Sequence, residues 1–498
     1  MTNERQQKVI IIGAGLGGLS AAISLASSGF RVQVFEKNDK VGGKLNVLVR
    51  EGFTLDLGPS ILLLPHVFQE LFRRAGRKME DYVSTQEVVP HWRNFFEGGT
   101  TIDLTPDMRQ MELELAKLPE GESIGFYRFL EYSRVQWGTT EAGYLRHGLD
   151  SLGDVLRFYG PIRSFLLFDV VRSMDAGVAR LIRNEKLRDI LDYFVKYVGS
   201  SPYDAPTVMN MLPYSQFGYG LWYVKGGMCN LARGMERLAR ELGVSITLNT
   251  EVASIGKTGS SVDGVVLKDG SSHRADIIVS NMEVIPAHTK LLGADRSVLK
   301  RYSRFAPSCS GLVIHLGVDR QYPQLAHHNF FYSGDSRRHF RAVFHQGMLS
   351  DDPTIYLVAP TRTDPTQAPA GCDVIKALPH IPHIRDTQPY TSEDYARYRD
   401  GVLGKLERMG LTDLRKHVVA EETWTPIDIQ ARYFSNKGSI YGVVSDRFRN
   451  LGFRAPKRSR EFRNLYFVGG SVNPGAGMPM VTLSGMLAAD MIARNAAG

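Results

Sequence analysis

The chain has 498 residues, of which 43% are hydrophobic and 22% are charged, and its formal net charge is +8. This length predicts two or more domains with a large buried core. Three cysteines without paired spacing argue against a disulfide framework or a zinc site and fit a reducing, cytoplasmic environment. No block of Lys and Arg and no nucleic-acid motif occurs, so we expect no nucleic-acid partner despite the positive charge.

The first pattern along the chain is a strand, a glycine-rich turn, a helix and a second strand. Strands are expected at 9–12 and 31–35, which are rich in β-branched residues, and a helix of small residues is expected at 19–28. The turn before this helix reads Gly13-Ala14-Gly15-Leu16-Gly17-Gly18. This order predicts a dinucleotide site with the pyrophosphate at the helix N-terminus. The stretch 9–30 carries no charge, but the βαβ pattern explains it better than a membrane span does.

The residues of this unit have separate expected roles. Gly13 makes the tight turn, Gly15 lets a pyrophosphate approach, and Gly18 lets the helix pack closely on the strand. Glu36, at the end of the second strand, fits an acceptor for the ribose hydroxyls of adenosine and would repel a 2′-phosphate. A purely structural turn is the alternative. The expected cofactor contacts of the unit are Gly13, Gly15, Gly17, Gly18, Glu36 and Lys37.

A second glycine pair, Gly42-Gly43, is followed by the cation Lys44. Such a pair offers a pyrophosphate another backbone contact and a charge partner. A surface hairpin turn is the alternative for this pair. The run Asp56-Leu57-Gly58-Pro59-Ser60 comes next, and we expect Gly58, Pro59 and Ser60 to contact the cofactor as well.

The C-terminal part contains a second candidate site for an anion or a carbonyl group. A buried strand is expected at 464–471, a glycine-rich loop at 473–481 and a helix at 482–497. Because this site is far in sequence from the first, the two suit one long ligand held at both ends, and FAD is such a ligand. The helix dipole could stabilise negative charge on the reduced ring. The expected contacts here are Gly469, Gly470, Gly477, Met478, Pro479 and Met480.

Residues 106–224 change to a helical pattern, in which apolar and basic residues alternate. One helical face is expected from Leu152, Val155, Leu156, Tyr159, Ile162, Phe165, Leu166 and Val170. Arginines are scattered among and after these residues, and a basic amphipathic segment can lie on an anionic bilayer. A helical cap packed on the core, with solvated arginines, is the alternative. We expect membrane contact at the surface, because no segment is suited to span a bilayer.

The stretch 286–425 predicts a second sheet, with strands at 310–316 and 354–358 and a helix at 392–409. The histidine pairs His327/His328 and His380/His383 invite a metal interpretation. No acidic cluster or CxxC motif accompanies them, so no metal is expected.

Several of these motifs resemble a known family. The glycine pair with Lys44 resembles the FAD-containing amine oxidase and phytoene desaturase superfamily, in which the second glycine motif marks FAD rather than NAD. The chain resembles bacterial carotenoid desaturases almost from end to end. The motifs that carry this resemblance are Gly469 to Met480, Asp56 to Ser60 and Val198 to Ser201. In this superfamily the backbone at the position of Val252 meets the adenine.

In detail, the chain looks most like the branch of this family that oxidises a terminal methyl group of a linear C30 carotene, 4,4′-diaponeurosporene. Three stretches carry that likeness, 322–331, 378–382 and 440–444. The resemblance implies oxidation of an allylic methyl group by FAD, to the alcohol and then the aldehyde, with O₂ or a quinone as electron acceptor. A desaturase acting on the same backbone is the nearest alternative, and a flavin amine oxidase is more distant. A non-enzymatic flavin-retaining protein of the membrane surface is the third.

One loop departs from the family pattern. Many desaturases have Thr-His-Pro-Gly where this chain has Val472-Asn473-Pro474-Gly475. Asn473 could orient a water or a developing oxygen function, but it cannot exchange protons near neutral pH as His can. We therefore expect Asn473 to be a catalytic residue. The alternative is that Asn473 only stabilises its own turn.

These inferences predict an α/β fold with a discontinuous, Rossmann-like FAD-binding domain, a mixed-sheet substrate domain and a helical, membrane-associating cap. The FAD-binding domain is expected to comprise 1–105, 225–285 and 426–498. The cap is expected at 106–224, and the substrate sheet with its helices at 286–425. The expected location is a peripheral one on the cytoplasmic side of a membrane.

Overall fold

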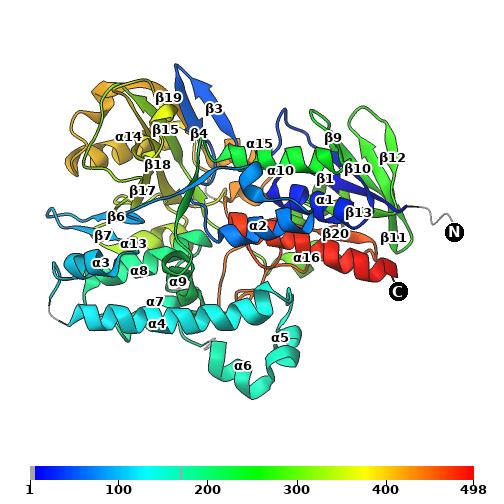
Figure 1. Cartoon of the computed structure of the whole chain (residues 1–498), viewed down its shortest axis with the longest axis horizontal. Helices are drawn as coiled ribbons and strands as arrows, with labels where there is room; N and C mark the ends of the chain where they lie inside the picture. The colour runs from blue at the N-terminus through cyan, green and yellow to red at the C-terminus, as the bar shows by residue number, and fades with distance from the viewer. Residues whose placement is uncertain (1–5, 120, 169–170, 388, 498) are drawn as a thin grey trace.

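The computed structural model of the chain describes residues 6–119, 121–168, 171–387 and 389–497. Two sheets lie side by side, with a layer of helices along one edge of the molecule (Figure 1). Within the described helices, no stretch combines the length and the apolar character that crossing a bilayer requires.

The first sheet is parallel and contains both strands of the predicted βαβ unit. Its strand order is β20-β13-β1-β2-β9. The strands are β1 (Lys8–Ile12), β2 (Arg31–Phe35), β9 (Ser245–Thr247), β13 (Ile277–Ser280) and β20 (Leu465–Phe467). Three strands from distant parts of the chain thus return to the N-terminal βαβ unit, as expected for a discontinuous nucleotide-binding fold.

Both faces of this parallel sheet are covered. Val9 and Ile11 face the side on which α1 (Leu16–Ser27), α10 (Cys229–Glu241) and α16 (Met478–Ala497) pack. Ile10 and Ile12 face the three-stranded meander on the other side. The meander consists of β10 (Val252–Thr258), β11 (Ser261–Leu267) and β12 (Ser272–Arg274). Burial on both faces explains why β1 is continuously apolar.

The second sheet is mixed, as predicted, and has eight strands. Its order is β19-β15-β18-β17-β16-β6-β7, with β14 paired to β18. Its strands are β6 (Trp92–Phe95), β7 (Thr101–Leu104), β14 (Ser310–Gly311), β15 (Val313–Val318), β16 (His328–Phe331), β17 (Ile355–Val358), β18 (Asp373–Ile381) and β19 (Val418–Trp424). The strands β6 and β7 belong to this sheet and not to the nucleotide sheet, because β6 pairs in parallel with β16.

The helical layer lies below the second sheet in Figure 1, on the side away from α14. It contains α3 (Met108–Leu115), α4 (Glu122–Thr140), α5 (Leu152–Tyr159), α6 (Pro161–Phe168), α7 (Met174–Ala179), α8 (Glu185–Asp192) and α9 (Leu212–Phe217). The single face predicted over 152–170 is wrong in one respect, since Gly160 ends α5 and Pro161 begins α6. Of the residues assigned to that face, Val170 and the side chains of Phe165 and Leu166 lie outside the described part of the chain.

Smaller elements connect or flank the two sheets. The two-stranded pairs are β3 (Val47–Arg50) with β4 (Phe53–Asp56), and β5 (Thr85–Glu87) with β8 (Trp222–Val224). The remaining α-helices are α2 (Pro65–Arg74), α11 (Val284–Pro286), α12 (Arg296–Tyr302), α13 (Ser336–Phe340), α14 (Ser392–Arg408) and α15 (Pro426–Tyr433).

Two helices begin earlier than predicted. α1 begins at Leu16 and not at residue 19, and α16 begins at Met478 and not at residue 482. In α1 the glycine-rich motif extends into the first helical turn, where Gly17 and Gly18 pack closely against other segments. Gly485 of α16 shows this contact, because a Cβ there would lie 2.5 Å from the carbonyl oxygen of Gly17.

Candidate functional site

A single cavity of about 710 Å³ runs from the glycine turns of the nucleotide sheet into the helical layer. Its lining includes every predicted cofactor contact except Gly18. Segments that are more than 400 residues apart in sequence, the turn at Gly13–Gly17 and the loop at Gly469–Met480, thus face the same space. Gly18 has the packing role predicted for it, because a Cβ there would lie 2.1 Å from the carbonyl oxygen of Gly13.

The two glycine turns of the N-terminal region are in direct contact. Gly15 and Gly42 form a parallel bridge, and a Cβ on Gly43 would lie 3.3 Å from the Cα of Gly15. Gly13, Gly42 and Gly43 all have positive φ, between 59° and 101°, which favours glycine. The pair Gly42-Gly43 therefore packs directly against the turn at Gly13–Gly18. It is not an isolated hairpin turn at the surface, which was the alternative.

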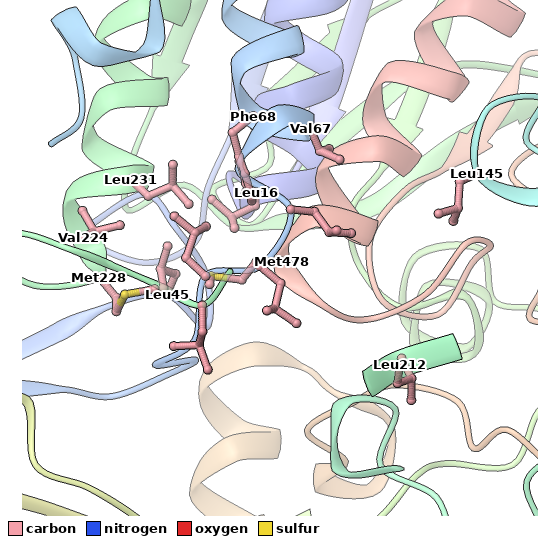
Figure 2. Packing of buried hydrophobic residues seen from close by; sticks show 14 of the residues in the cluster. Leu16, Leu45, Val67, Phe68, Leu145, Leu212, Val224, Met228, Leu231 and Met478 are labelled. Carbon is pink, nitrogen blue, oxygen red and sulfur yellow. The ribbon is translucent and has the colours of Figure 1, made fainter. Parts of the chain in front are cut away.

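Apolar residues that follow the glycine turns hold these turns together. Leu16 follows Gly15, Leu45 comes directly after Lys44, and Met478 follows Gly477. All three belong to one buried cluster, together with Val224 and other residues shown in Figure 2. Burial of each such side chain stabilises the fold by about 1.5–3 kcal/mol, so the cluster fixes the relative positions of the three turns.

One end of the cavity contains Glu36, the residue predicted to accept from the ribose of adenosine. Its carboxylate is buried and accepts hydrogen bonds from the backbone N–H of Ala14 at 2.8 Å, from that of Asn38 at 2.9 Å and from the Asn38 side chain at 2.8 Å. A carboxylate has about four acceptor positions, so capacity for a ribose hydroxyl remains. Val252 lines the same end of the cavity.

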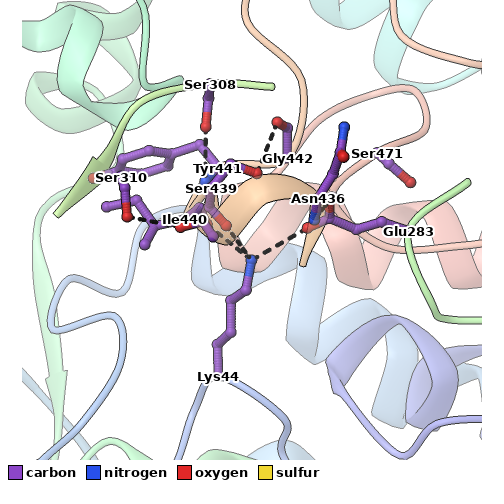
Figure 3. A network of polar contacts seen from close by, with 12 residues as sticks. Lys44, Glu283, Ser308, Ser310, Asn436, Ser439, Ile440, Tyr441, Gly442 and Ser471 are labelled. Atoms are coloured by element: carbon purple, nitrogen blue, oxygen red, sulfur yellow. Dashed lines mark hydrogen bonds and ion pairs between the residues drawn. The ribbon is translucent and has the colours of Figure 1, made fainter. Parts of the chain in front are cut away.

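Lys37 and Lys44 are both engaged with protein groups. The ammonium of Lys37 lies 3.5 Å from the centroid of the Phe434 ring and donates to the carbonyl oxygen of Ala431 at 2.8 Å. Lys44 reaches Glu283 at 3.4 Å and the carbonyl oxygens of Ser439 and Ile440 (Figure 3). Their predicted contacts with a pyrophosphate stay predictions.

Asn281 is a residue of the site that the sequence reasoning missed. A Cβ on Gly15 would lie 2.6 Å from its Nδ2, and a Cβ on Gly17 would lie 2.7 Å from its Oδ1. Asn281 directly follows β13, and ligands of open α/β sheets bind at the carboxyl ends of parallel strands, so that rule could have identified it.

The third glycine loop faces the cavity from the N-terminus of α16. Gly469 has a φ of 98°, and the helix begins at Met478. The first N–H groups of a helix have no partner within it, so they are available to a carbonyl or an anion at this end. The glycine cradle, the ribose acceptor and this helix terminus fit a flavin dinucleotide, which on binding would supply a two-electron acceptor.

Asn473 does not have the surroundings of a catalytic group. It is buried and is absent from the cavity lining. Its Oδ1 accepts from the Tyr144 hydroxyl at 2.5 Å and from the backbone N–H of Arg454 at 2.8 Å, and its Nδ2 donates to the carbonyl oxygens of Asp150 and Arg454. This geometry leaves no group free to orient a water, so it does not support the predicted catalytic role. It supports a structural role that is wider than the expected stabilisation of one turn.

Beyond the loop at Gly469–Met480, the cavity becomes mainly apolar. Its walls there come from α4, α5, α6 and α9 and from the second sheet. The apolar side chains that line it include Trp137, Leu145, Leu152, Val155, Leu156, Met209, Met211, Leu212 and Leu378. Such a compartment suits a long hydrocarbon, and α5 and α6 form its wall at the edge of the molecule (Figure 1).

One amine lies inside this compartment. Lys196, in the 3₁₀ segment Tyr193–Tyr197, is 4% exposed and lines the cavity. Its Nζ is 3.7 Å from the ring centroid of Tyr356 and 5.0 Å or less from those of Trp92, Tyr197 and Phe330. A desolvated cation–π contact is worth about 2 kcal/mol, whereas removing an ammonium from water costs several kcal/mol. Burial therefore lowers the pKa of Lys196 well below its ordinary value.

The histidines considered as metal ligands are instead neutral, buried groups. Burial lowers the pKa of His327 and of His380 to about 3. The Nδ1 of His327 lies 2.7 Å from the Thr363 hydroxyl, and that of His328 lies 2.9 Å from the Tyr356 hydroxyl. Among the described residues, no cluster of three or more His, Cys, Asp or Glu could hold a metal ion.

A parallel sheet with glycine turns and a mixed sheet that share one cavity define the fold of a flavoprotein oxidoreductase. Comparison with known proteins makes the assignment specific: the chain belongs to the family of flavin-containing amine oxidoreductases, which it matches over residues 16–493. It is accordingly a flavin-dependent oxidoreductase. The resemblance found in the sequence is confirmed at the level of the family.

Two curated relatives are similar over nearly their whole length. The chain is 64% identical to a 4,4′-diapolycopene oxygenase of Methylomonas sp. over 492 residues, which cover 99% of each chain. It is 50% identical to the 4,4′-diaponeurosporene oxygenase of Staphylococcus aureus (strain USA300) over 485 residues, which cover 97% of each chain.

Solved structures with low identity share the fold. Putrescine oxidase bound to putrescine has a TM-score of 0.66 at 15% identity, with 98% of this chain and 100% of the other covered. An oxidoreductase from Methanosarcina mazei has a TM-score of 0.64 at 17% identity, with 96% and 99% covered. At this identity the likeness concerns the fold alone.

Proposed function

We propose that the protein uses FAD to oxidise a terminal methyl group of a linear C30 carotenoid, 4,4′-diaponeurosporene, to the alcohol and then to the aldehyde. The observation that carries the proposal is the continuity of the cavity, in which the glycine cradle and Glu36 open directly into an apolar compartment. The names of the two curated relatives support the same substrate class.

The bound flavin would accept the hydride, the oxygen atom of the alcohol would come from O₂ or water, and the chain's own residues would position the substrate. The apolar wall that includes Leu152, Val155 and Leu156 would restrict the orientations of a bound polyene. Holding the reacting methyl group in a near-attack geometry accounts for much of the rate in such a site. Asn473 has a structural role here, because it ties Tyr144 to Arg454 beside the glycine loop.

The proposal includes contact with a membrane surface through α5 and α6. Leu152, Leu156, Phe158 and Ile162 are large apolar side chains at least 39% exposed, and Ile162 is 77% exposed. The side chain of Arg157 on α5 is 83% exposed. Exposed apolar and basic side chains on α5 and α6, two helices that also line the apolar compartment, suit a substrate that enters from a bilayer. The electron acceptor in this proposal is O₂ or a quinone.

Product analysis in cells that make C30 carotenes tests this function. The expected products from 4,4′-diaponeurosporene are the terminal alcohol and aldehyde, whereas the C30 phytoene-type precursor should keep its central single bonds. A longer conjugated system with intact methyl groups would instead show a desaturase. Absence of any change, in a protein that retains its flavin, would favour the non-enzymatic alternative.

A further inference from the structure

The amine of Lys196 is a polar group of the substrate compartment to which the proposed function gives no role. Within the described part of the chain, its Nζ has no hydrogen-bond acceptor and no carboxylate partner. Its contacts are aromatic ring faces, of which that of Tyr356 is the nearest at 3.7 Å. Lysine is almost never fully buried unless it is paired, so this arrangement calls for a functional explanation.

The titratable groups that face Lys196 provide no negative charge. His328 on β16 and His380 on β18 are neutral, since burial lowers the pKa of each imidazole. Tyr197 and Tyr356 stay protonated, because burial raises the pKa of both phenols. Lys376 on β18 is the remaining charged neighbour, and its ammonium donates to the carbonyl oxygens of Asp56 and Gly58.

Burial and a positive neighbour leave Lys196 as a free amine, although the four aromatic faces favour its ammonium form. A neutral amine has an available lone pair, and it does not repel the positive charge that develops on a polyene when a hydride leaves. A protonated amine in the same place could not accept a proton. It would also repel the positive charge that develops on the polyene.

We propose that Lys196 is the catalytic base of the alcohol-oxidising step, a proposal that rests on the function proposed above. The C–H bond of the terminal carbinol breaks and its hydride passes to the oxidised flavin. The O–H bond breaks, its proton passes to the Nζ of Lys196, and the electron pair of the O–H bond forms the C=O bond. The alcohol is oxidised by two electrons, the flavin is reduced by two, and Lys196 becomes an ammonium.

The surrounding rings suit both states of the cycle. The ring faces of Trp92, Phe330 and Tyr356 can receive the ammonium that forms, through cation–π contacts. The amine returns to its neutral form when the proton leaves to solvent after product release.

A covalent trapping experiment tests the position and the protonation state of Lys196 without turnover. Farnesal, a linear isoprenoid aldehyde, is incubated with the intact protein and sodium cyanoborohydride near neutral pH. A neutral amine beside the aldehyde carbon forms an imine with loss of water, and reduction fixes it as a secondary amine. The expected adduct lies on the peptide that contains Lys196, in the flavin-loaded and the flavin-free protein alike. Adducts confined to exposed lysines would overturn the proposal.

Kinetics of Lys196→Met test the chemical role. General bases contribute about 10²- to 10⁴-fold, so the rate from alcohol to aldehyde should fall at least about 100-fold and the alcohol should accumulate. In the wild type this rate should decrease as the pH is lowered and Lys196 becomes protonated, whereas in the variant the dependence should disappear. Lys300→Met, on the exposed face of α12, is the matched control and should keep both rate and pH profile.

The possible results separate the two proposals. If the wild type makes aldehyde and Lys196→Met does so with the same rate and pH profile, the base role is overturned and the proposed function stands. If the wild type makes no oxygenated product, the proposed function fails and the base role fails with it.

Discussion

At the residue scale, Gly15 and Gly17 leave no room for a Cβ atom beside Asn281. A Cβ on Gly15 would lie 2.6 Å from the Nδ2 of Asn281, and a valine would extend further into the space expected for the pyrophosphate. In Gly15→Val we expect flavin occupancy to fall at least tenfold, which corresponds to about 1.4 kcal/mol of binding free energy. The flavin absorbance of the purified protein measures this occupancy. Gly401→Val, at an exposed position of α14 with no atom within 4 Å, is the control, and equal flavin loss in both variants would contradict the account.

Asn473 gives a second prediction at this scale. Asn473→Ala leaves the Tyr144 hydroxyl and the Arg454 N–H without their acceptor, so the free energy of unfolding should fall by about 1–3 kcal/mol. Turnover per bound flavin should stay unchanged, because the side chain is turned away from the cavity. Thermal unfolding and flavin-normalised turnover measure these effects, with Asn495→Ala at the exposed end of α16 as the control. A tenfold loss of turnover without a change in stability would restore the catalytic role.

The sequence identifies the glycines better than it identifies the catalytic side chains, for a physical reason. A glycine with positive φ has a local cause, so its motif is visible in a short stretch of chain. Asn281 and Lys196 acquire their surroundings only through tertiary packing: Asn281 between two glycine turns, Lys196 among rings from three separate segments. Lys196 belongs to no sequence motif, so no local pattern indicates it.

At the scale of elements, α5 and α6 form the edge that faces away from the two sheets (Figure 1). Ile162→Asp should weaken co-sedimentation with anionic liposomes about tenfold, because burying one such side chain is worth about 1.5–3 kcal/mol. Binding should also weaken as salt rises, since the Debye length falls from about 10 Å at 0.1 M to about 3 Å at 1 M. Val49→Asp, on β3 at the opposite edge and 68% exposed, is the control. Binding that Ile162→Asp leaves intact would remove these helices from the membrane contact.

The elements that sequence patterns predicted well are those with a clear period and a clear boundary. The βαβ unit and the strand β17 fall within a few residues of their expected positions. The break between α5 and α6 was missed because Gly160 interrupts an apolar spacing that otherwise continues. The sheet to which β6 and β7 belong depends on pairing with β16, more than 200 residues later, which no local pattern encodes.

At the scale of the whole molecule, the cavity spans both halves of a dinucleotide site, and this predicts the form of the cofactor. Glu36 and Val252 lie at an adenosine end that FMN would leave empty. Denaturation should therefore release FAD, one per chain, and NADPH alone should not reduce it. Chromatography of the released cofactor and the flavin spectrum after addition of NADPH provide the test. Release of FMN, or of NADP without flavin, would contradict the prediction of FAD.

The central claim is that this one cavity brings a terminal methyl group of a carotenoid to the flavin. The most direct test is anaerobic mixing of the flavin-loaded protein with 4,4′-diaponeurosporene, with the flavin absorbance and the carotenoid products followed together. The account predicts that the flavin bleaches in step with loss of the substrate, and that after air is admitted the product carries oxygen on its terminal carbon, with the in-chain double bonds unchanged. Bleaching that accompanies a new in-chain double bond and an intact methyl group, or no bleaching at all, would contradict it.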